Sequence, residues 1–101
     1  MYRVNVSFFL KAQEYALLNE FLRTRLVPLL RDDEGVAQVD LLEVMAQPMD
    51  DMVLALLISL EQERDLGHYL SEVLGERLEL LGKTFGERVL YHVTPMRQIA
   101  L

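Results

Sequence analysis

Apolar and polar residues alternate along three separate segments of the chain. In residues 2–9 every even position is apolar, while the odd positions hold Arg3, Asn5, Ser7 and Phe9. This period of two predicts a β-strand with one apolar and one largely polar face. Residues 36–46 alternate less regularly, which favours an edge strand or a bulge, and residues 88–94 alternate again.

The segment 52–60 differs because it has no polar face. Its sequence is MVLALLISL, with apolar residues at both odd and even positions. It is too short to span a bilayer as a helix and is bounded by acidic residues, so it predicts a strand buried on both faces.

Two further segments have the spacing of amphipathic helices. Between residues 12 and 29, and again between 61 and 81, apolar residues recur every three or four positions with charged residues between them. Pro28 predicts a kink or restart in the first helix. In the second helix, Gly75 weakens the middle and Gly82 is expected to end it.

Turn and breaker residues separate these elements. Residues 32–35 (DDEG) predict a turn, Pro48 is expected to block strand pairing, Asp50 and Asp51 indicate a further turn, and Pro95 is expected to end regular pairing of the last strand. The order is therefore strand, helix, strand, strand, helix, strand.

This βαββαβ order predicts an α+β fold of the ferredoxin-like type over residues 1–101, as one domain. Right-handed crossovers place both helices on one face of a four-stranded antiparallel sheet, with strands 2–9 and 52–60 at its centre. A central strand covered on one side only should alternate, and segment 52–60 does not. We therefore expect the helix-free face to be covered by a second copy of the chain in a two-fold homodimer.

The composition narrows the classes of partner. The 101 residues carry a formal net charge of −6, their basic residues are scattered, and they contain no cysteine. Nucleic acid and membrane surfaces are therefore not expected partners, and disulfides and thiolate chemistry are excluded. The N-terminal residues lack the pattern of a secretion signal, so a cytoplasmic location is expected.

Three parts of the sequence resemble a known family. These are the run from Phe85 to Thr94 (FGERVLYHVT), the opening residues 2–6 (YRVNV) and the pair Arg77-Leu78. Together they resemble a small uncharacterised bacterial family known only as a domain of unknown function, with Gly75 standing where that family's pattern has a proline. The resemblance implies a stand-alone dimeric ferredoxin-like barrel and brings no established activity. The wider superfamily includes cofactor-independent monooxygenases, lactone isomerases and haem-handling enzymes.

A cluster of polar residues is predicted on the helix-free face. Strand parity assigns five side chains to that face: Arg3, Asn5, Ser7, His92 and Thr94. These are the candidate ligand-binding residues, with His92 and Arg3 as candidate catalytic residues: His92 can act as a base while Arg3 and Asn5 orient a substrate. The alternative is that they form cross-strand pairs or line a dimer interface, and a shift of one residue in register would turn His92 toward the helices.

No metal site or cofactor is predicted. His68 has the position of a surface histidine, and the acidic runs 32–34 and 50–51 lack the ligand spacing of a calcium loop. The sequence therefore favours a small homodimer that is non-catalytic or binds a small ligand. The alternative is a cofactor-independent enzyme, of monooxygenase or isomerase type, acting on a small, partly aromatic substrate.

Overall fold

The computed structural model, which describes residues 1–45 and 51–101, contains one antiparallel sheet of four strands. The strands are β1 (Tyr2–Lys11), β2 (Val36–Val44), β3 (Asp51–Leu60) and β4 (Val89–Arg97). Their spatial order is β2-β3-β1-β4, so β1 and β3 are central and β2 and β4 are edges. The predicted ferredoxin-like βαββαβ fold is confirmed, and the consecutive strands β2 and β3 pair in antiparallel fashion.

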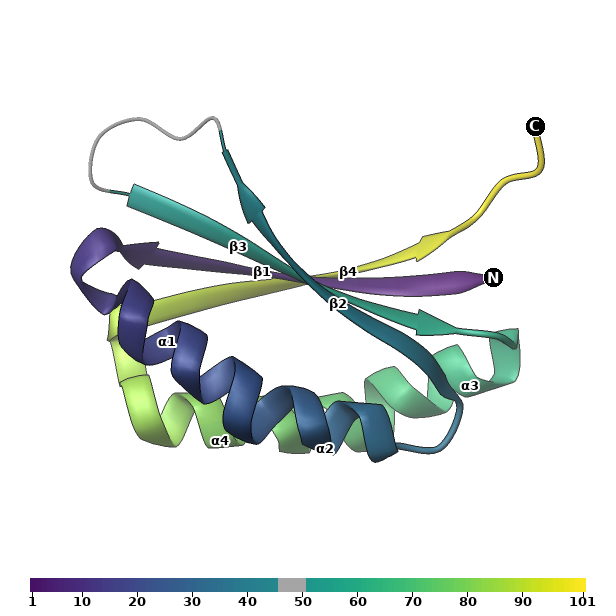
Figure 1. The fold of residues 1–101 in the computed structure, drawn as a ribbon. Coiled ribbons are helices and arrows are strands. Elements are labelled where there is room, and N and C mark those ends of the chain that lie inside the picture. The colour runs from purple at the N-terminus through teal and green to yellow at the C-terminus, as the bar shows by residue number, and fades with distance from the viewer. Residues whose placement is uncertain (46–50) are drawn as a thin grey trace.

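Each helical connection is made of several short elements. The first comprises η1 (Ala12–Glu14), α1 (Tyr15–Phe21), η2 (Leu22–Leu26) and α2 (Val27–Asp32). The second comprises α3 (Glu63–His68), η3 (Tyr69–Val73), α4 (Leu74–Phe85) and η4 (Gly86–Arg88). Figure 1 shows both connections beneath the same face of the twisted sheet, so in the described parts of the chain the opposite face carries no helix. None of the described helices is both long and apolar enough to cross a membrane.

A π-helical stretch interrupts each connection, at η2 and at η3. In each stretch a hydroxyl donates to the carbonyl four residues earlier: Thr24 to Glu20 at 2.7 Å and Ser71 to Gly67 at 2.9 Å. A π-helical turn interrupts the backbone hydrogen bonds of a regular α-helix. The two hydroxyls supply hydrogen-bond donors to backbone carbonyls at these interruptions. Because Pro28 has no N–H to donate, the interruption at η2 falls directly before it, and the helix restarts at Val27 as predicted.

The hydrophobic core lies between the sheet and the helices. β1 contributes its even-numbered apolar residues, and β3 contributes the residues opposite them, with Val4 facing Ile58 and Val6 facing Leu56. The other large, fully buried side chains include Phe8, Leu18, Leu22, Leu26, Leu30, Leu60 and Leu81. The alternation in β1 therefore correctly predicted which side of this strand packs against the helices. In β3 the inner side is buried, whereas Val53, Ala55 and Leu57 on the other side are only half-buried within one chain.

A polar network ties the two helical connections together. Asp33, at the end of the first connection, accepts hydrogen bonds from Tyr69 Oη at 3.1 Å and from the Arg77 guanidinium, whose Nε lies 3.2 Å away. Burial, and then the charge of Asp33, raise the pKa of the Tyr69 hydroxyl well above its ordinary value of 10.0. The hydrogen bond to Asp33 likewise raises the pKa of Arg77. This network is on the helix side and stabilises the fold.

The second helix ends later than the sequence indicates. Gly82 was expected to stop it, but α4 continues to Phe85, and Gly86 is the capping residue with φ +57°. A left-handed backbone favours glycine, and Gly82 has ordinary helical geometry. The prediction placed the stop one turn too early because both glycines follow the apolar stripe.

The last strand also continues beyond its expected end. Pro95 was expected to end regular pairing, but β4 runs through it to Arg97, and Pro95 lies opposite Val4. β4 is an edge strand, where alternate backbone groups face away from the sheet and a missing N–H is tolerated. The irregular alternation of the second strand is explained by both features proposed for it, because β2 is an edge and has a bulge between Val36 and Gln38. Pro48 and Asp50 lie outside the described residues, and Asp51 begins β3.

Candidate functional site

The helix-free face is organised in rows that cross the four strands. Residues directly opposite one another in a sheet project from the same face, so the strand registers define each row. From one end of the sheet to the other, in the order β2-β3-β1-β4, the rows are Gln38–Ser59–Arg3–Met96, Asp40–Leu57–Asn5–Thr94, Leu42–Ala55–Ser7–His92 and Val44–Val53–Phe9–Leu90. We call these the arginine row, the threonine row, the histidine row and the apolar row. The face therefore becomes less polar from the arginine row to the apolar row.

The apolar row is exposed although it contains no polar side chain. Val44, Phe9 and Leu90 have exposed fractions of 39%, 45% and 60%, and Val53 is half-buried. Contiguous exposed apolar side chains cost hydration free energy and mark surfaces at which a ligand or partner binds. The apolar row is the strongest such feature of this face.

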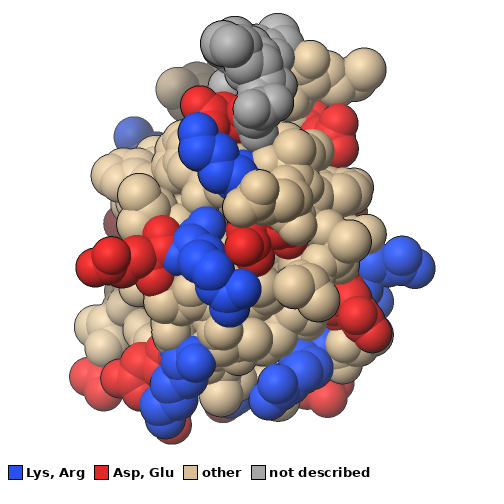
Figure 2. All heavy atoms as spheres, turned by 90° about the vertical axis from the view of Figure 1, so that its left-hand side faces the viewer, with Lys and Arg blue, Asp and Glu red and all other residues tan. Residues whose placement is uncertain are grey.

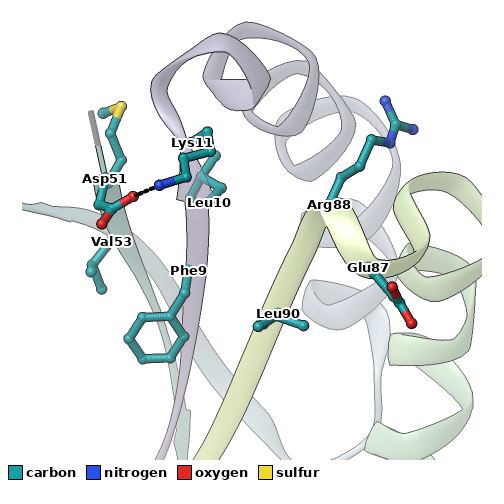
Figure 3. Close-up of a pocket in the computed structure, with 9 residues that line it drawn as sticks. Phe9, Leu10, Lys11, Asp51, Val53, Glu87, Arg88 and Leu90 are labelled. Carbon is teal, nitrogen blue, oxygen red and sulfur yellow. Dashed lines mark hydrogen bonds and ion pairs between the residues drawn. The ribbon is translucent and has the colours of Figure 1, made fainter.

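A pocket of about 440 Å³ lies where the apolar row meets the end of the sheet. Phe9, Val53 and Leu90 form its apolar part, and Leu10 and Met52 also line it. Figure 3 shows Phe9 and Leu90 projecting from the neighbouring strands β1 and β4. The volume lies within the ~300–1,000 Å³ of small-molecule sites.

Charged groups border the outer end of this pocket. Lys11 Nζ and Asp51 Oδ1 form an ion pair of 2.5 Å between the end of β1 and the start of β3. Arg88 also lines the pocket, but its guanidinium pairs with the end of η1, where Nη1 lies 3.3 Å from Glu14 Oε2. Figure 2, which faces this end of the molecule, shows acidic and basic side chains side by side. The entrance is therefore charged with both signs, and its floor is apolar.

The histidine row brings two of the predicted polar residues together. His92 lies directly opposite Ser7, and both are next to the apolar row. The Asn5 amide donates to Ser7 Oγ at 2.9 Å, which leaves the Ser7 hydroxyl proton available to another acceptor. Within the described residues the His92 imidazole has no hydrogen-bond partner, and the side chain is exposed. His92 can therefore exchange a proton with a molecule lying on the apolar row, and Ser7 can donate a hydrogen bond to it.

Arg3 lies at the other end of the face. Its partner across β4 is Met96, and its guanidinium donates to Gln98 Oε1 at 3.4 Å. Arg3 and Ser7 are four residues apart in β1, a separation of about 13 Å along a strand. The threonine row, with Asn5 opposite Thr94, lies between them. All five predicted residues thus share the helix-free face, but the structure groups His92 with Ser7 and places Arg3 in a separate hollow of about 350 Å³ with Gln38 and Asp40.

The apolar row was not predicted as a site from the sequence. Its signal was Phe9, an apolar residue at an odd position of β1, where the other odd positions up to Ser7 are polar. Leu90 gave the matching signal in β4, two residues before His92. Neither position is informative until the register shows that Phe9 and Leu90 are neighbours.

The described residues contain no group of three or more His, Asp or Glu side chains placed to hold a metal ion. Among the charged residues that line the pocket, Lys11 pairs with Asp51 and Arg88 pairs with Glu14, whereas Glu87 makes no ion pair with a described residue. The chemistry that this site offers comes from the imidazole and hydroxyl of the histidine row.

Comparison with known proteins identifies the fold. No model of a protein family matches the sequence, and no curated protein matches it. Among solved structures, a protein of Deinococcus radiodurans described as a candidate antibiotic biosynthesis monooxygenase aligns with a TM-score of 0.71 and 14% identity, covering 100% of this chain and 95% of that one. HapK from Hahella chejuensis aligns with a TM-score of 0.66 and 8% identity, covering 100% and 95%.

A third structure was solved with a ligand bound. It is a monooxygenase of Streptomyces coelicolor in complex with nanaomycin D, with a TM-score of 0.59, 12% identity and coverage of 99% of this chain and 90% of that one. At these identities the likeness establishes the ferredoxin-like fold. The domain-of-unknown-function family suggested by the sequence is not identified by these comparisons.

Proposed function

We propose that this protein is a homodimer that binds a small ring compound against the apolar row of its helix-free face. The observation that carries the proposal is the succession of two rows: a fully apolar row directly beside one that holds His92 and Ser7. Such a site accepts an apolar ring on Phe9 and Leu90 and meets a hydroxyl or carbonyl substituent with the imidazole. Convergent polar groups beside an apolar wall are the usual form of a small-molecule site.

The second copy completes this site. Within one chain the apolar row is covered from below by the sheet and is open above, so a bound ring would keep one face in water. Packing two helix-free faces together buries both apolar rows and excludes water from the pocket. The family resemblance in the sequence supports the same arrangement, and the complex of a protein of the same fold with nanaomycin D supports the binding of a ligand by this fold.

Ligand binding is tested with a panel of mono-, bi- and tricyclic hydroxyarenes in a thermal-unfolding assay. A ligand at 100 times its Kd stabilises the folded protein by about 2.7 kcal/mol, which gives a measurable rise in Tm. Phe9→Ala is expected to weaken binding roughly 10-fold or more, because a buried aromatic contact of about 1.5–3 kcal/mol is lost. Leu29→Ala, at an exposed leucine of α2 on the helix side, is the matched control and should bind as the wild type does. Binding that is equal in Phe9→Ala and the wild type would contradict the proposal.

Cofactor-independent oxidation is a second candidate function. It is favoured by the pairing of His92 with Ser7 beside the apolar row and by the monooxygenase descriptions of proteins with this fold. His92 would remove a proton from an activated ring CH₂, and the carbanion would reduce O₂, so that CH₂ and O₂ give C=O and water. Ser7 would donate to the developing oxyanion.

Oxygen uptake with an anthrone-type substrate tests this second function. His92→Ala should lower the rate by about 10²–10⁴-fold, the usual contribution of a general base. His92→Asn is a control of similar size that cannot take up the proton, and it should be equally slow. Uptake that is unchanged in both variants would show that His92 is not the base, and the absence of uptake in the wild type would exclude this activity for that substrate.

A further inference from the structure

A second pocket lies in the helix layer, on the opposite side of the sheet from the helix-free face. Its volume is about 250 Å³. Leu17, Phe21 and Arg25 line it from α1 and η2, and Thr84, Phe85 and Arg88 line it from the end of α4 and from η4. Two segments far apart in sequence thus form one hollow, which is independent of the site proposed above.

Two aromatic rings form the base of this pocket. The rings of Phe21 and Phe85 meet edge to face, with centroids 5.6 Å apart and planes at 83°. Both side chains are buried, whereas Leu17 beside them is 56% exposed. The base is therefore rigid, and Leu17 adds an exposed apolar wall against which a ligand can bury surface.

Each ring carries an arginine on its face. The Cζ of Arg25 lies 5.3 Å from the centroid of Phe21, and that of Arg88 lies 5.5 Å from the centroid of Phe85. These cation–π contacts fix the position of both guanidinium groups. The pocket is thus a hollow with an aromatic base and two positioned cations.

The two arginines differ in what neutralises them. Arg88 donates to the carbonyls of Phe85 and Thr84, which hold its guanidinium in place, and its ion pair with Glu14 neutralises its charge. Arg25 makes neither a hydrogen bond nor an ion pair with any described residue, although it is held over Phe21. Its planar fork of N–H donors therefore remains available, and this fork matches the two oxygens of a carboxylate.

We propose that this pocket binds a small monocarboxylate with an aromatic or short aliphatic body. The carboxylate would pair with Arg25, and the body would lie against Leu17 and the edges of the two phenylalanine rings. A volume of 250 Å³ is below the range usual for drug-sized ligands, which limits the body to one ring or a short chain. Glu20 also lines the pocket, and its carboxylate repels a doubly charged phosphate more strongly than a singly charged carboxylate, which favours the monocarboxylate.

The proposal is tested by titrating the ¹⁵N-labelled protein with benzoate and following the backbone amide shifts. The expected result is a saturable change centred on the amides of Leu17, Arg25 and Thr84. Arg25→Gln should weaken binding at least about 10-fold, because the variant loses the charge-assisted hydrogen bonds to the carboxylate. Arg23→Gln is the matched control: it removes an exposed arginine of the same π-helical stretch that does not line this pocket, and it should bind as the wild type does.

Benzyl alcohol separates the role of charge from that of the ring. It has the same ring without the carboxylate and should bind more weakly than benzoate by the same factor as the Arg25→Gln variant loses. Equal affinities of Arg25→Gln and the wild type for benzoate would overturn the proposal, as would shifts centred on Phe9 and Leu90 instead. Neither result would affect the site on the helix-free face, whose tests use uncharged hydroxyarenes.

Discussion

At the scale of single residues, Tyr69 couples the stability of the fold to pH. Its hydroxyl is buried and donates to Asp33, so the folded protein holds the neutral form and the pKa is raised above 10.0. In the unfolded chain the hydroxyl ionises at its ordinary pKa of about 10. The folded protein therefore retains a proton that the unfolded chain releases.

Tyr69 is accordingly predicted to make the protein less stable at high pH. Its contribution is complete below pH 10 and is lost as pH rises above that value, at up to about 1.4 kcal/mol per pH unit. The free energy of unfolding, measured in urea between pH 8 and pH 11, should fall more steeply for the wild type than for Tyr69→Phe. Parallel curves for the two proteins would show that the fold does not hold this proton.

The helix-free face shows what the sequence can say about single residues. Alternation assigned Arg3, Asn5 and Ser7 to one face of β1 because successive side chains of a strand must point to opposite sides. It did not reveal that His92 lies opposite Ser7 rather than beside Arg3, because the register between β1 and β4 depends on contacts distant in sequence. For the same reason Phe9 and Leu90 could not be recognised as neighbours.

At the scale of elements, Gly82 and Gly86 test how the second helix ends. A Cβ at Gly82 meets nothing within 4 Å, and the backbone there is helical, whereas Gly86 has φ +57° and ψ −135°. Gly82→Ala should stabilise the protein by about 0.5–1 kcal/mol, since alanine has less backbone freedom to lose. Gly86→Ala should destabilise it by about 1–2 kcal/mol because its backbone is strained for an L-residue.

Urea unfolding of the two variants beside the wild type measures this difference. The two changes add the same methyl group four residues apart, so an effect of the same sign in both would contradict the assignment of Gly86 as the cap. The order of elements was predictable because periods of 2 and 3.6 are local properties. The position of the cap was not, because both glycines are compatible with a helix end until the backbone angle is known.

At the scale of the whole molecule, the proposed dimer rests on the exposed apolar row. Leu90 is 60% exposed on this row, and Leu17 is 56% exposed on the helix side, so the two leucines form a matched pair. Leu90→Asp should convert the dimer to a monomer, because a charge would be buried between two apolar rows. Leu17→Asp should leave the dimer intact. Size-exclusion chromatography with light scattering distinguishes the two results, and a loss of the dimer in both variants would show that the helix-free face is not the interface.

The most direct test of this account is the mass of the wild-type protein by sedimentation equilibrium at low micromolar concentration. Two chains packed through their helix-free faces predict twice the mass of one chain, without dissociation over that range. A mass equal to one chain would leave Val44, Phe9 and Leu90 in water, and it would contradict both the dimer and the enclosed binding site built on it.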